Sequence, residues 1–71
     1  MDITIRKHVL NNALRFGGKV RPDVVLGAAL KERPELKTDI PKLRKTIEEA
    51  IIKATKLSAP EIKKELEKLA P

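Results

Sequence analysis

The sequence predicts an all-α protein, a small compact bundle of about four helices. Three observations support this fold class. Apolar residues recur at intervals of three and four, no stretch alternates apolar and polar residues as a half-buried strand would, and helix-starting and helix-ending residues divide the chain into four segments. A chain of 71 residues forms one domain at most, so we expect residues 1–71 to be a single helical domain with a thin core.

The first helix is expected to begin after Asp2, a good N-cap, and to end near Phe16, where Gly17 and Gly18 follow. At 100° per residue, one broad arc carries the apolar side chains that should be buried, namely Ile5, Val9, Leu10, Ala13, Leu14 and Phe16. His8 falls on the opposite arc, so we expect an ordinary surface imidazole there. Arg6 lies at the edge of the apolar arc, where its long stem can reach outward.

The second helix is expected to begin at Pro22, which suits a first helical position, and to end before Pro34. Residues 24–30 of this segment are apolar all round. That pattern is typical of a helix in the middle of a bundle, so we expect Gly27 to let a neighbouring helix approach closely.

The third helix is expected to open near Thr38 and Asp39, with an apolar stripe made of Ile40, Leu43, Ile47, Ala50, Ile51, Ala54 and Leu57. Ile52 falls on the opposite, charged side. The fourth helix should start at a capping box formed by Ser58 and Glu61, and its buried stripe comprises Ile62, Leu66 and Leu69.

The composition provides few of the side chains that enzyme active sites use. There is no Cys and one His, and nothing matches a phosphate-binding loop or a dinucleotide fingerprint. Glutamates stand three or four residues before lysines, as in Glu49 with Lys53 and Glu65 with Lys68, so they predict surface ion pairs. We therefore expect no catalytic residue, metal site or cofactor in this chain.

Other residue counts restrict the function classes that remain. A single Phe, with no Trp or Tyr, argues against stacking of nucleobases on an aromatic platform. No apolar run is long enough to span a membrane and no signal-peptide pattern opens the chain, so a cytoplasmic protein is expected. The content of Lys and Glu is high and that of amides is low, a composition typical of hyperthermophile proteins.

The net charge of +6 is unevenly distributed. Residues 1–45 hold eleven basic and five acidic side chains, whereas the five Lys and five Glu of residues 46–71 cancel. Such a basic field attracts polyanions and supplies phosphate affinity that is independent of sequence. It is equally typical of a well-solvated surface that binds nothing.

The turn between the first two helices concentrates these charges. Gly17 and Gly18 form a tight, open turn that leads into a helix N-terminus, flanked by Arg15, Lys19 and Arg21. Backbone N–H groups and cations in this arrangement predict a phosphate cradle. The alternative is that the glycines only cap a helix and the cations are merely exposed. Ile52 is likewise either incidental or the anchor of a protein interface.

The residues of this turn also carry a family resemblance. The chain resembles the N-terminal extension of archaeal-type glutamyl-tRNA synthetases in the pattern Leu10-x-Asn12-Ala13-x-x-x-Gly17-Gly18-Lys19-x-x-Pro22-x-x-Val25-Leu26-Gly27-x-x-Leu30. Pro34-Glu35-Leu36, Leu57-Ser58 and Leu69-Ala70-Pro71 fit the same pattern. The chain is similar too to the helical tail domain of tRNA-dependent amidotransferases and to the extension of glutaminyl-tRNA synthetases. Gly27-Ala28-Ala29 departs from it, since a Lys is expected soon after that glycine, and Arg21 stands where a small or amide residue is commoner.

The resemblance implies a non-catalytic domain cut from a longer glutamate–tRNA ligase, whose missing catalytic domain would use ATP and magnesium. It implies tRNA as a partner, held at its phosphates through Lys19 and Arg21 without readout of bases. A second hypothesis is protein docking through Ile52, to the rest of the synthetase or to another translation protein. A third is a free-standing basic protein that binds DNA.

Overall fold

The computed structural model describes residues 2–69, which form four α-helices and no strand. They are α1 (Ile3–Phe16), α2 (Pro22–Glu32), α3 (Ile40–Thr55) and α4 (Ala59–Leu69), with short 3₁₀ turns at Gly17–Lys19 and Pro34–Leu36. The predicted all-α class is confirmed, and the helices begin and end within about two residues of the predicted positions. Ala70 and Pro71, which the family pattern includes, lie outside the described residues.

Side chains cap the helices as the sequence predicts. The Asp2 carboxylate accepts a hydrogen bond from the backbone N–H two residues on, at 2.8 Å, and Asp39 accepts one from the N–H three residues on. The capping box of α4 is reciprocal, because the Ser58 N–H donates to Glu61 at 3.0 Å and the Glu61 N–H donates to the Ser58 hydroxyl at 3.4 Å. These bonds satisfy donors that a helix start leaves without partners.

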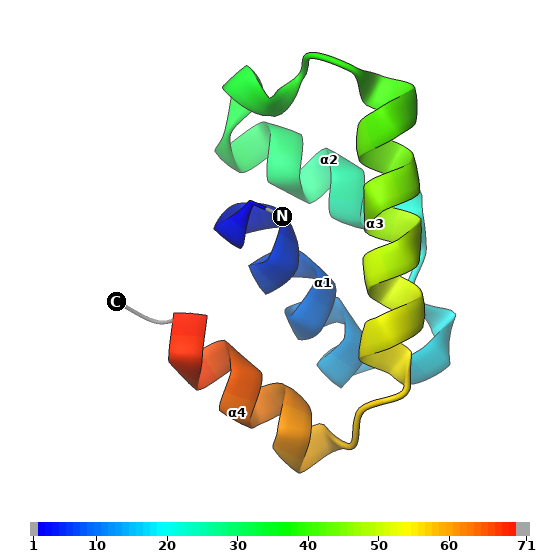
Figure 1. Cartoon of the computed structure of the whole chain (residues 1–71), viewed down its shortest axis with the longest axis vertical. Helices are drawn as coiled ribbons and strands as arrows, with labels where there is room; N and C mark the ends of the chain where they lie inside the picture. Colours follow the sequence, from blue (N-terminus) through cyan, green and yellow to red (C-terminus); the bar gives the residue numbers. More distant parts are fainter. Residues whose placement is uncertain (1, 70–71) are drawn as a thin grey trace.

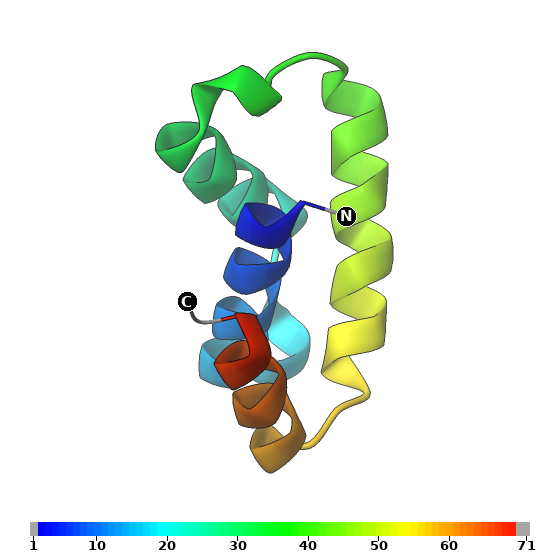
Figure 2. The same cartoon turned by 60° about the vertical axis from the view of Figure 1, so that its left-hand side comes forward.

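Helix α1 is the centre of the molecule. It packs against each of the other three helices, and α2 and α4 lie on either side of it (Figure 1). Helix α3 runs across this layer along the long axis of the molecule (Figure 2). The prediction that the second helix occupies the middle is therefore wrong. The broad apolar arc of α1 supplies buried side chains in three directions, namely Ile5, Val9, Leu10 and Ala13.

Helix α2 instead lies at the edge and buries only Val25 and Ala29 completely. Val24 is 52% exposed, and a Cβ atom added at Gly27 would meet nothing within 4 Å. The expectation that Gly27 admits a close neighbour is wrong for this reason. The exposed residues of α2 are Asp23, Val24, Gly27, Lys31 and Glu32, so its outer face mixes charged and apolar side chains.

The core is one cluster to which all four helices contribute. Helix α3 buries much of its predicted stripe, with Ile47 fully enclosed, while Ile52 on the opposite side is 58% exposed, as expected. Helix α4 adds Ile62, with Leu66 and Leu69 packed against the cluster. The core members below one-tenth exposure are Ile5, Val9, Leu10, Ala13, Val25, Ala29, Ile47, Ala50, Ile51, Ala54 and Ile62.

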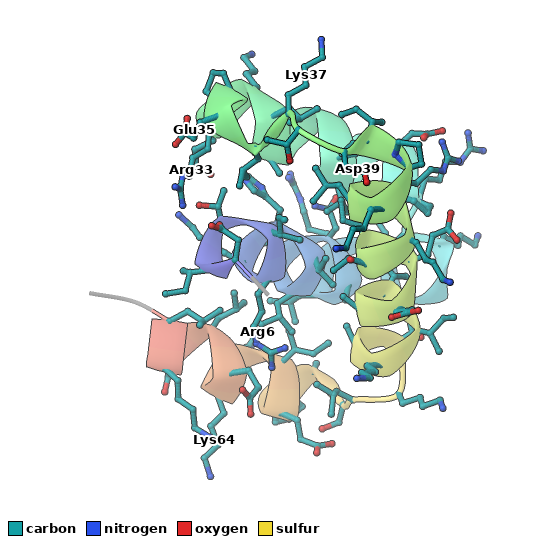
Figure 3. All side chains as sticks on the ribbon, turned by 45° about the horizontal axis from the view of Figure 1, so that its top comes forward. Arg6, Arg33, Glu35, Lys37, Asp39 and Lys64 are labelled. Atoms are coloured by element: carbon teal, nitrogen blue, oxygen red, sulfur yellow. The ribbon has the colours of Figure 1, made fainter. Side chains whose placement is uncertain are left out.

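Ion pairs tie α1 to its neighbours on both sides. Arg6 reaches Glu65 of α4 at 3.3 Å, and Arg33, just beyond α2, pairs with Asp2 at 2.9 Å (Figure 3). The predicted pair of Glu65 with Lys68 is present at 3.6 Å. The predicted pair of Glu49 with Lys53 is not among the ion pairs that residues 2–69 form, and Glu48 pairs with Arg44 instead.

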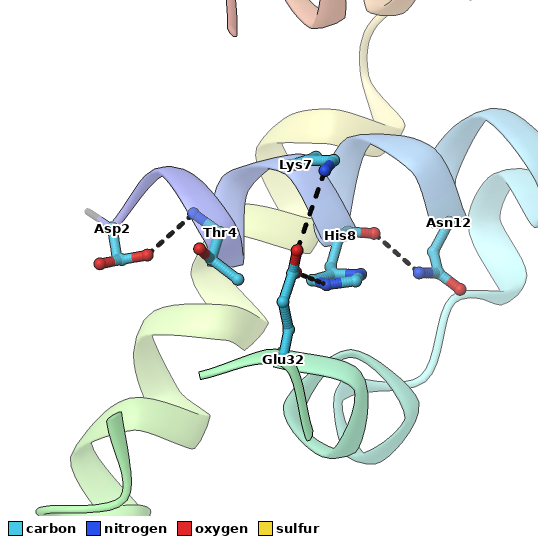
Figure 4. Close-up of polar contacts among 6 residues, drawn as sticks. All are labelled: Asp2, Thr4, Lys7, His8, Asn12 and Glu32. Carbon is cyan, nitrogen blue, oxygen red and sulfur yellow. Dashed lines mark hydrogen bonds and ion pairs between the residues drawn. The ribbon is translucent and has the colours of Figure 1, made fainter. Parts of the chain in front are cut away.

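His8 is not the open surface imidazole that the helical arc predicts. Its side chain is only 23% exposed, and its Nε2 lies 2.7 Å from Glu32, which Lys7 also approaches (Figure 4). The last turn of α2 covers this side of α1. A helical wheel drawn for one segment contains no information about that partner, which lies 24 residues away in the chain.

Candidate nucleic-acid interface

Backbone geometry at the end of α1 requires a glycine at one position. Gly17 has φ 60° and ψ −131°, a combination open to glycine and strained for other residues, and its N–H donates to the Ala13 carbonyl. Gly18 has no such constraint, since its φ is not in the positive region and an added Cβ would meet nothing within 4 Å. The 3₁₀ turn that follows ends at Lys19, and extended residues Val20 and Arg21 lead into α2.

The backbone at this turn offers fewer donors than the cradle hypothesis assumes. The Gly17 N–H is already bonded, and Pro22 has none. The N–H groups of Val24 and Val25 turn back to the Arg21 carbonyl, at 3.1 and 3.4 Å. Anion binding here would therefore depend on side chains more than on the backbone.

The arginines of this turn differ from the other arginines of the molecule in their ion pairing. Three of the five arginines in the sequence form ion pairs, namely Arg6, Arg33 and Arg44. Within residues 2–69, Arg15 and Arg21 pair with no carboxylate, and neither does Lys19 between them. Several other lysines are also unpaired there, but no other arginine is. All three side chains of the turn are exposed and so available to an anion.

The acidic residue nearest to this turn in the sequence has its ion-pair partner on another helix. Asp23, two residues after Arg21, forms an ion pair with Arg44 of α3, and Arg44 also contacts Glu48 at 3.3 Å. Asp23 is the acidic residue nearest to Arg21 in the sequence, and its charge repels a phosphate less when a cation stands beside it. The pairing across α2 and α3 therefore offsets part of the negative charge that Asp23 adds near the turn.

Phe16 was expected in the core, but its side chain is 53% exposed. It is the last residue of α1, beyond the part of the helix that its neighbours cover. A hollow of about 160 Å³ lies beside it, lined by Asn12, Phe16, Lys19, Arg21 and Val24. The Arg15 guanidinium carbon lies 5.9 Å from the centre of the Phe16 ring, within the range of a cation–π contact.

The structure thus brings Lys19 and Arg21 together on one hollow. Arg15 lies over the Phe16 ring beside this hollow, and Gly17 forms the turn. Ile52 lies outside this group on the exposed face of α3. Sequence reasoning missed Phe16, Val24 and Asn12. The one available signal for Phe16 is its place directly before two glycines, where a helix end leaves one side uncovered.

A second set of charges lies around the N-terminus of α1. The hydrogen bond from the Thr4 N–H holds the pKa of Asp2 below its usual range, and the Arg33 cation lowers that pKa further. Arg33 likewise lowers the pKa of Glu35, to which it donates at 2.8 Å (Figure 3). These groups satisfy one another, so they cap and cross-link the fold.

Two larger hollows lie elsewhere on the molecule. One of about 290 Å³ opens between α1, α3 and α4, with Arg6 and Glu65 at its rim, and one of about 370 Å³ adjoins Asp2 and Asp39.

Among residues 2–69, no cluster of three or more His, Asp or Glu side chains is arranged to hold a metal ion. None of the helices in that part of the chain is long and apolar enough to cross a membrane.

Comparison with known proteins identifies relatives along nearly the whole chain. It is 37% identical over 65 residues to a glutamate–tRNA ligase of Methanopyrus kandleri, 38% over 69 residues to one of Methanocaldococcus jannaschii, and 34% over 67 residues to one of Nitrosopumilus maritimus. These alignments cover 92, 97 and 94% of this chain but only 11, 12 and 12% of the relatives. No protein-family model matches the chain, and no solved structure matches it.

These relatives confirm the resemblance to archaeal glutamyl-tRNA synthetases. The chain spans about an eighth of the length of the relatives it matches, and the match corresponds to a small domain of the synthetase.

Proposed function

We propose that this chain is a non-catalytic domain of a glutamate–tRNA ligase, one that helps to bind or orient tRNA by contacts between its cations and tRNA phosphates. The observation that carries the tRNA assignment is that, within residues 2–69, Arg15 and Arg21 are the two arginines without a carboxylate partner, and they flank Lys19 at one turn. Their charge is available to an external polyanion, and the relatives are glutamate–tRNA ligases.

Side-chain chemistry supports phosphate as the ligand. A guanidinium binds phosphate oxygens through two parallel N–H donors, and a lysine adds a point charge. Duplex RNA hides its bases in a deep groove, so exposed cations meet phosphates first. Aminoacylation itself, with its ATP and magnesium, would take place in the part of the parent enzyme that this chain does not include.

The test is a titration of labelled glutamate tRNA with the chain, between about 50 and about 200 mM salt. Each phosphate contact contributes about 0.7–0.9 to the slope of log affinity against log salt. Lys19→Ala/Arg21→Ala should reduce this slope by about 1 to 2 units. Tight binding that ignores salt would contradict the proposal, as would an unchanged slope in the variant.

A matched control removes the same charge from another face. Lys63 and Lys64 are exposed on α4 and form no ion pair within the described residues, and Lys64 projects away from the bundle (Figure 3). Lys63→Ala/Lys64→Ala should leave the slope nearly unchanged. Equal losses in the two double variants would mean that only net charge matters. Duplex DNA that binds as tightly as tRNA would favour a general DNA-binding role instead.

A second candidate function, protein docking, rests on Ile52. This side chain is 58% exposed among charged neighbours on α3, where most of its apolar surface is left to solvent. If it anchors the rest of the synthetase or another translation protein, Ile52→Glu should abolish capture of that partner and leave tRNA affinity unchanged. Retained capture would exclude Ile52 as the anchor.

A further inference from the structure

We infer that the hollow beside Phe16 takes one unstacked nucleobase of the bound RNA, with the base against the Phe16 ring and the flanking phosphates on Lys19 and Arg21. The inference rests on the proposed function and refines it, because it names a looped-out or single-stranded nucleotide, in place of a duplex, as the ligand of this turn. It also replaces the expectation that the protein makes no contact with bases.

The floor of the hollow is apolar and open. Phe16 and Val24 are 53 and 52% exposed, and they lie together although they come from different helices. The other large apolar side chains exposed in residues 2–69, Ile3 and Ile52, do not line this hollow. The only aromatic residue of the sequence is thus at the surface, where its ring can stack on any base.

The size of the hollow fits a single ring. At about 160 Å³ it is smaller than the roughly 300–1,000 Å³ of pockets that enclose a drug-sized ligand. Its size is thus closer to that of one flat group than to that of a drug-sized ligand.

The rim has the charge that a nucleotide needs. Lys19 and Arg21 line the hollow and have no carboxylate partner in residues 2–69, while Arg44 holds Asp23. Arg15 lies over the Phe16 ring, so a base on that ring would also lie beside a guanidinium. An apolar floor with cations along its edge complements a base whose phosphates lie on either side.

Asn12 adds a means of discriminating among bases. Its Nδ2 donates to the His8 carbonyl at 2.7 Å, which fixes the orientation of the amide, since a carbonyl oxygen can only accept (Figure 4). The Asn12 Oδ1, an acceptor, has no hydrogen-bond partner in the described residues, while Nδ2 donates one of its two hydrogens to the His8 carbonyl. A base with an exocyclic amino group can donate to it, whereas uracil presents a carbonyl oxygen at the equivalent position.

The test uses the chain with short single-stranded oligonucleotides at one salt concentration. Phe16→Ala should weaken binding of oligo-C at least about fivefold and leave the salt slope unchanged, because a stacked base is lost and no charge is removed. Phe16 is exposed, so the variant should fold, and its circular dichroism and melting curve verify this. Phe16→Tyr is the matched control that restores an aromatic ring and should retain the affinity.

The pyrimidine pair tests the role of Asn12. Oligo-C should bind more tightly than oligo-U to the native chain, and Asn12→Ala should remove this difference. Equal binding of the two by the native chain would overturn the role of Asn12.

The result that overturns the inference is an unchanged oligonucleotide affinity in Phe16→Ala. If tRNA still binds that variant with a steep salt slope, the result supports the proposed phosphate contacts and excludes base stacking on Phe16. If neither tRNA nor oligonucleotide binds the native chain, both the phosphate contacts and the base stacking are excluded. An acidic peptide that competes for the hollow more tightly than oligo-C would also overturn the inference and indicate a protein ligand.

Discussion

The carboxylate of Asp23 pairs with Arg44 of α3 and not with Arg21, which stands two residues away from it in the chain. This ion pair engages the acidic residue that stands nearest in the sequence to the turn between α1 and α2. Arg21, Lys19 and Arg15 form no ion pair among residues 2–69, and they lie at or beside a hollow whose floor is Phe16 and Val24. The proposed contact with tRNA phosphates depends on that arrangement.

Removal of Arg44 should therefore weaken tRNA binding although Arg44 is not placed at the hollow. In Arg44→Gln, Asp23 is released to pair with Arg21 or to repel phosphate, so tRNA affinity at low salt should fall by about two- to fivefold. Asp23→Asn in the same chain should restore it. If the second substitution restores nothing, Asp23 does not compete for the cations of the turn. The measurement is a double-mutant cycle of tRNA affinities at one salt concentration.

The two glycines of the turn should respond differently to alanine. Gly17→Ala should cost about 1–3 kcal/mol of unfolding free energy, because its φ of 60° is strained for a residue with a Cβ. Gly18→Ala should be neutral or stabilise by about 0.4–1 kcal/mol, since it restricts the unfolded chain and meets nothing in the folded one. Urea denaturation of both variants measures this. Equal costs would show that Gly18 has a constraint which the backbone geometry does not reveal.

The enclosed core of α3 should be sensitive to the loss of one methyl group. Ile47→Val should destabilise the protein by about 0.5–1.5 kcal/mol, because Ile47 is fully buried. Ile52→Val is the same substitution on the exposed side of the same helix and should change stability by less than about 0.5 kcal/mol. Urea midpoints of the two variants give the comparison. A larger effect at Ile52 would mean that this face is covered in solution.

Acid should destabilise the fold through its capping carboxylates. The pKa values of Asp2, Glu35 and Glu61 are lowered, chiefly by the Thr4 N–H, by Arg33 and by the Ser58 N–H respectively. The folded state thus binds these protons more weakly than the unfolded chain does. The stabilisation is complete above the ordinary carboxyl range near about pH 4 and is lost as the pH falls below it.

Urea midpoints measured from neutral pH down to about pH 3 test this linkage. Asp2→Asn should make the dependence on pH shallower than it is in the native chain, because one of the three carboxylates no longer titrates. An identical dependence in the two proteins would contradict the assignment to Asp2.

Much of the fold follows from local signals. Asp2, Asp39 and the pair Ser58 and Glu61 mark helix starts, and each forms the predicted capping bond. Hydrophobic periodicity likewise predicts the buried stripes of α3 and α4. Each of these signals acts within a few residues of its own helix, so the sequence contains it directly.

The remaining features depend on contacts between helices, which periodicity does not specify. An all-round apolar segment indicates a buried helix, yet α2 lies at the edge and α1 in the centre. The wheel that places Phe16 in the core assumes that a neighbour covers the last turn of α1, and none covers it fully. The pairs of His8 with Glu32 and Asp23 with Arg44 join residues 24 and 21 positions apart. The cations of the turn were predicted as a group, but their apolar neighbours were not.

The proposed tRNA interface can be mapped directly on the chain by NMR. Glutamate tRNA is added to the isotope-labelled chain, and backbone amide shifts and line widths are followed residue by residue. We expect the largest changes on residues 12–24, with the Phe16 ring protons among them, and almost no change on α4. Changes centred on α4 or around Ile52, with residues 12–24 unmoved, would contradict this expectation.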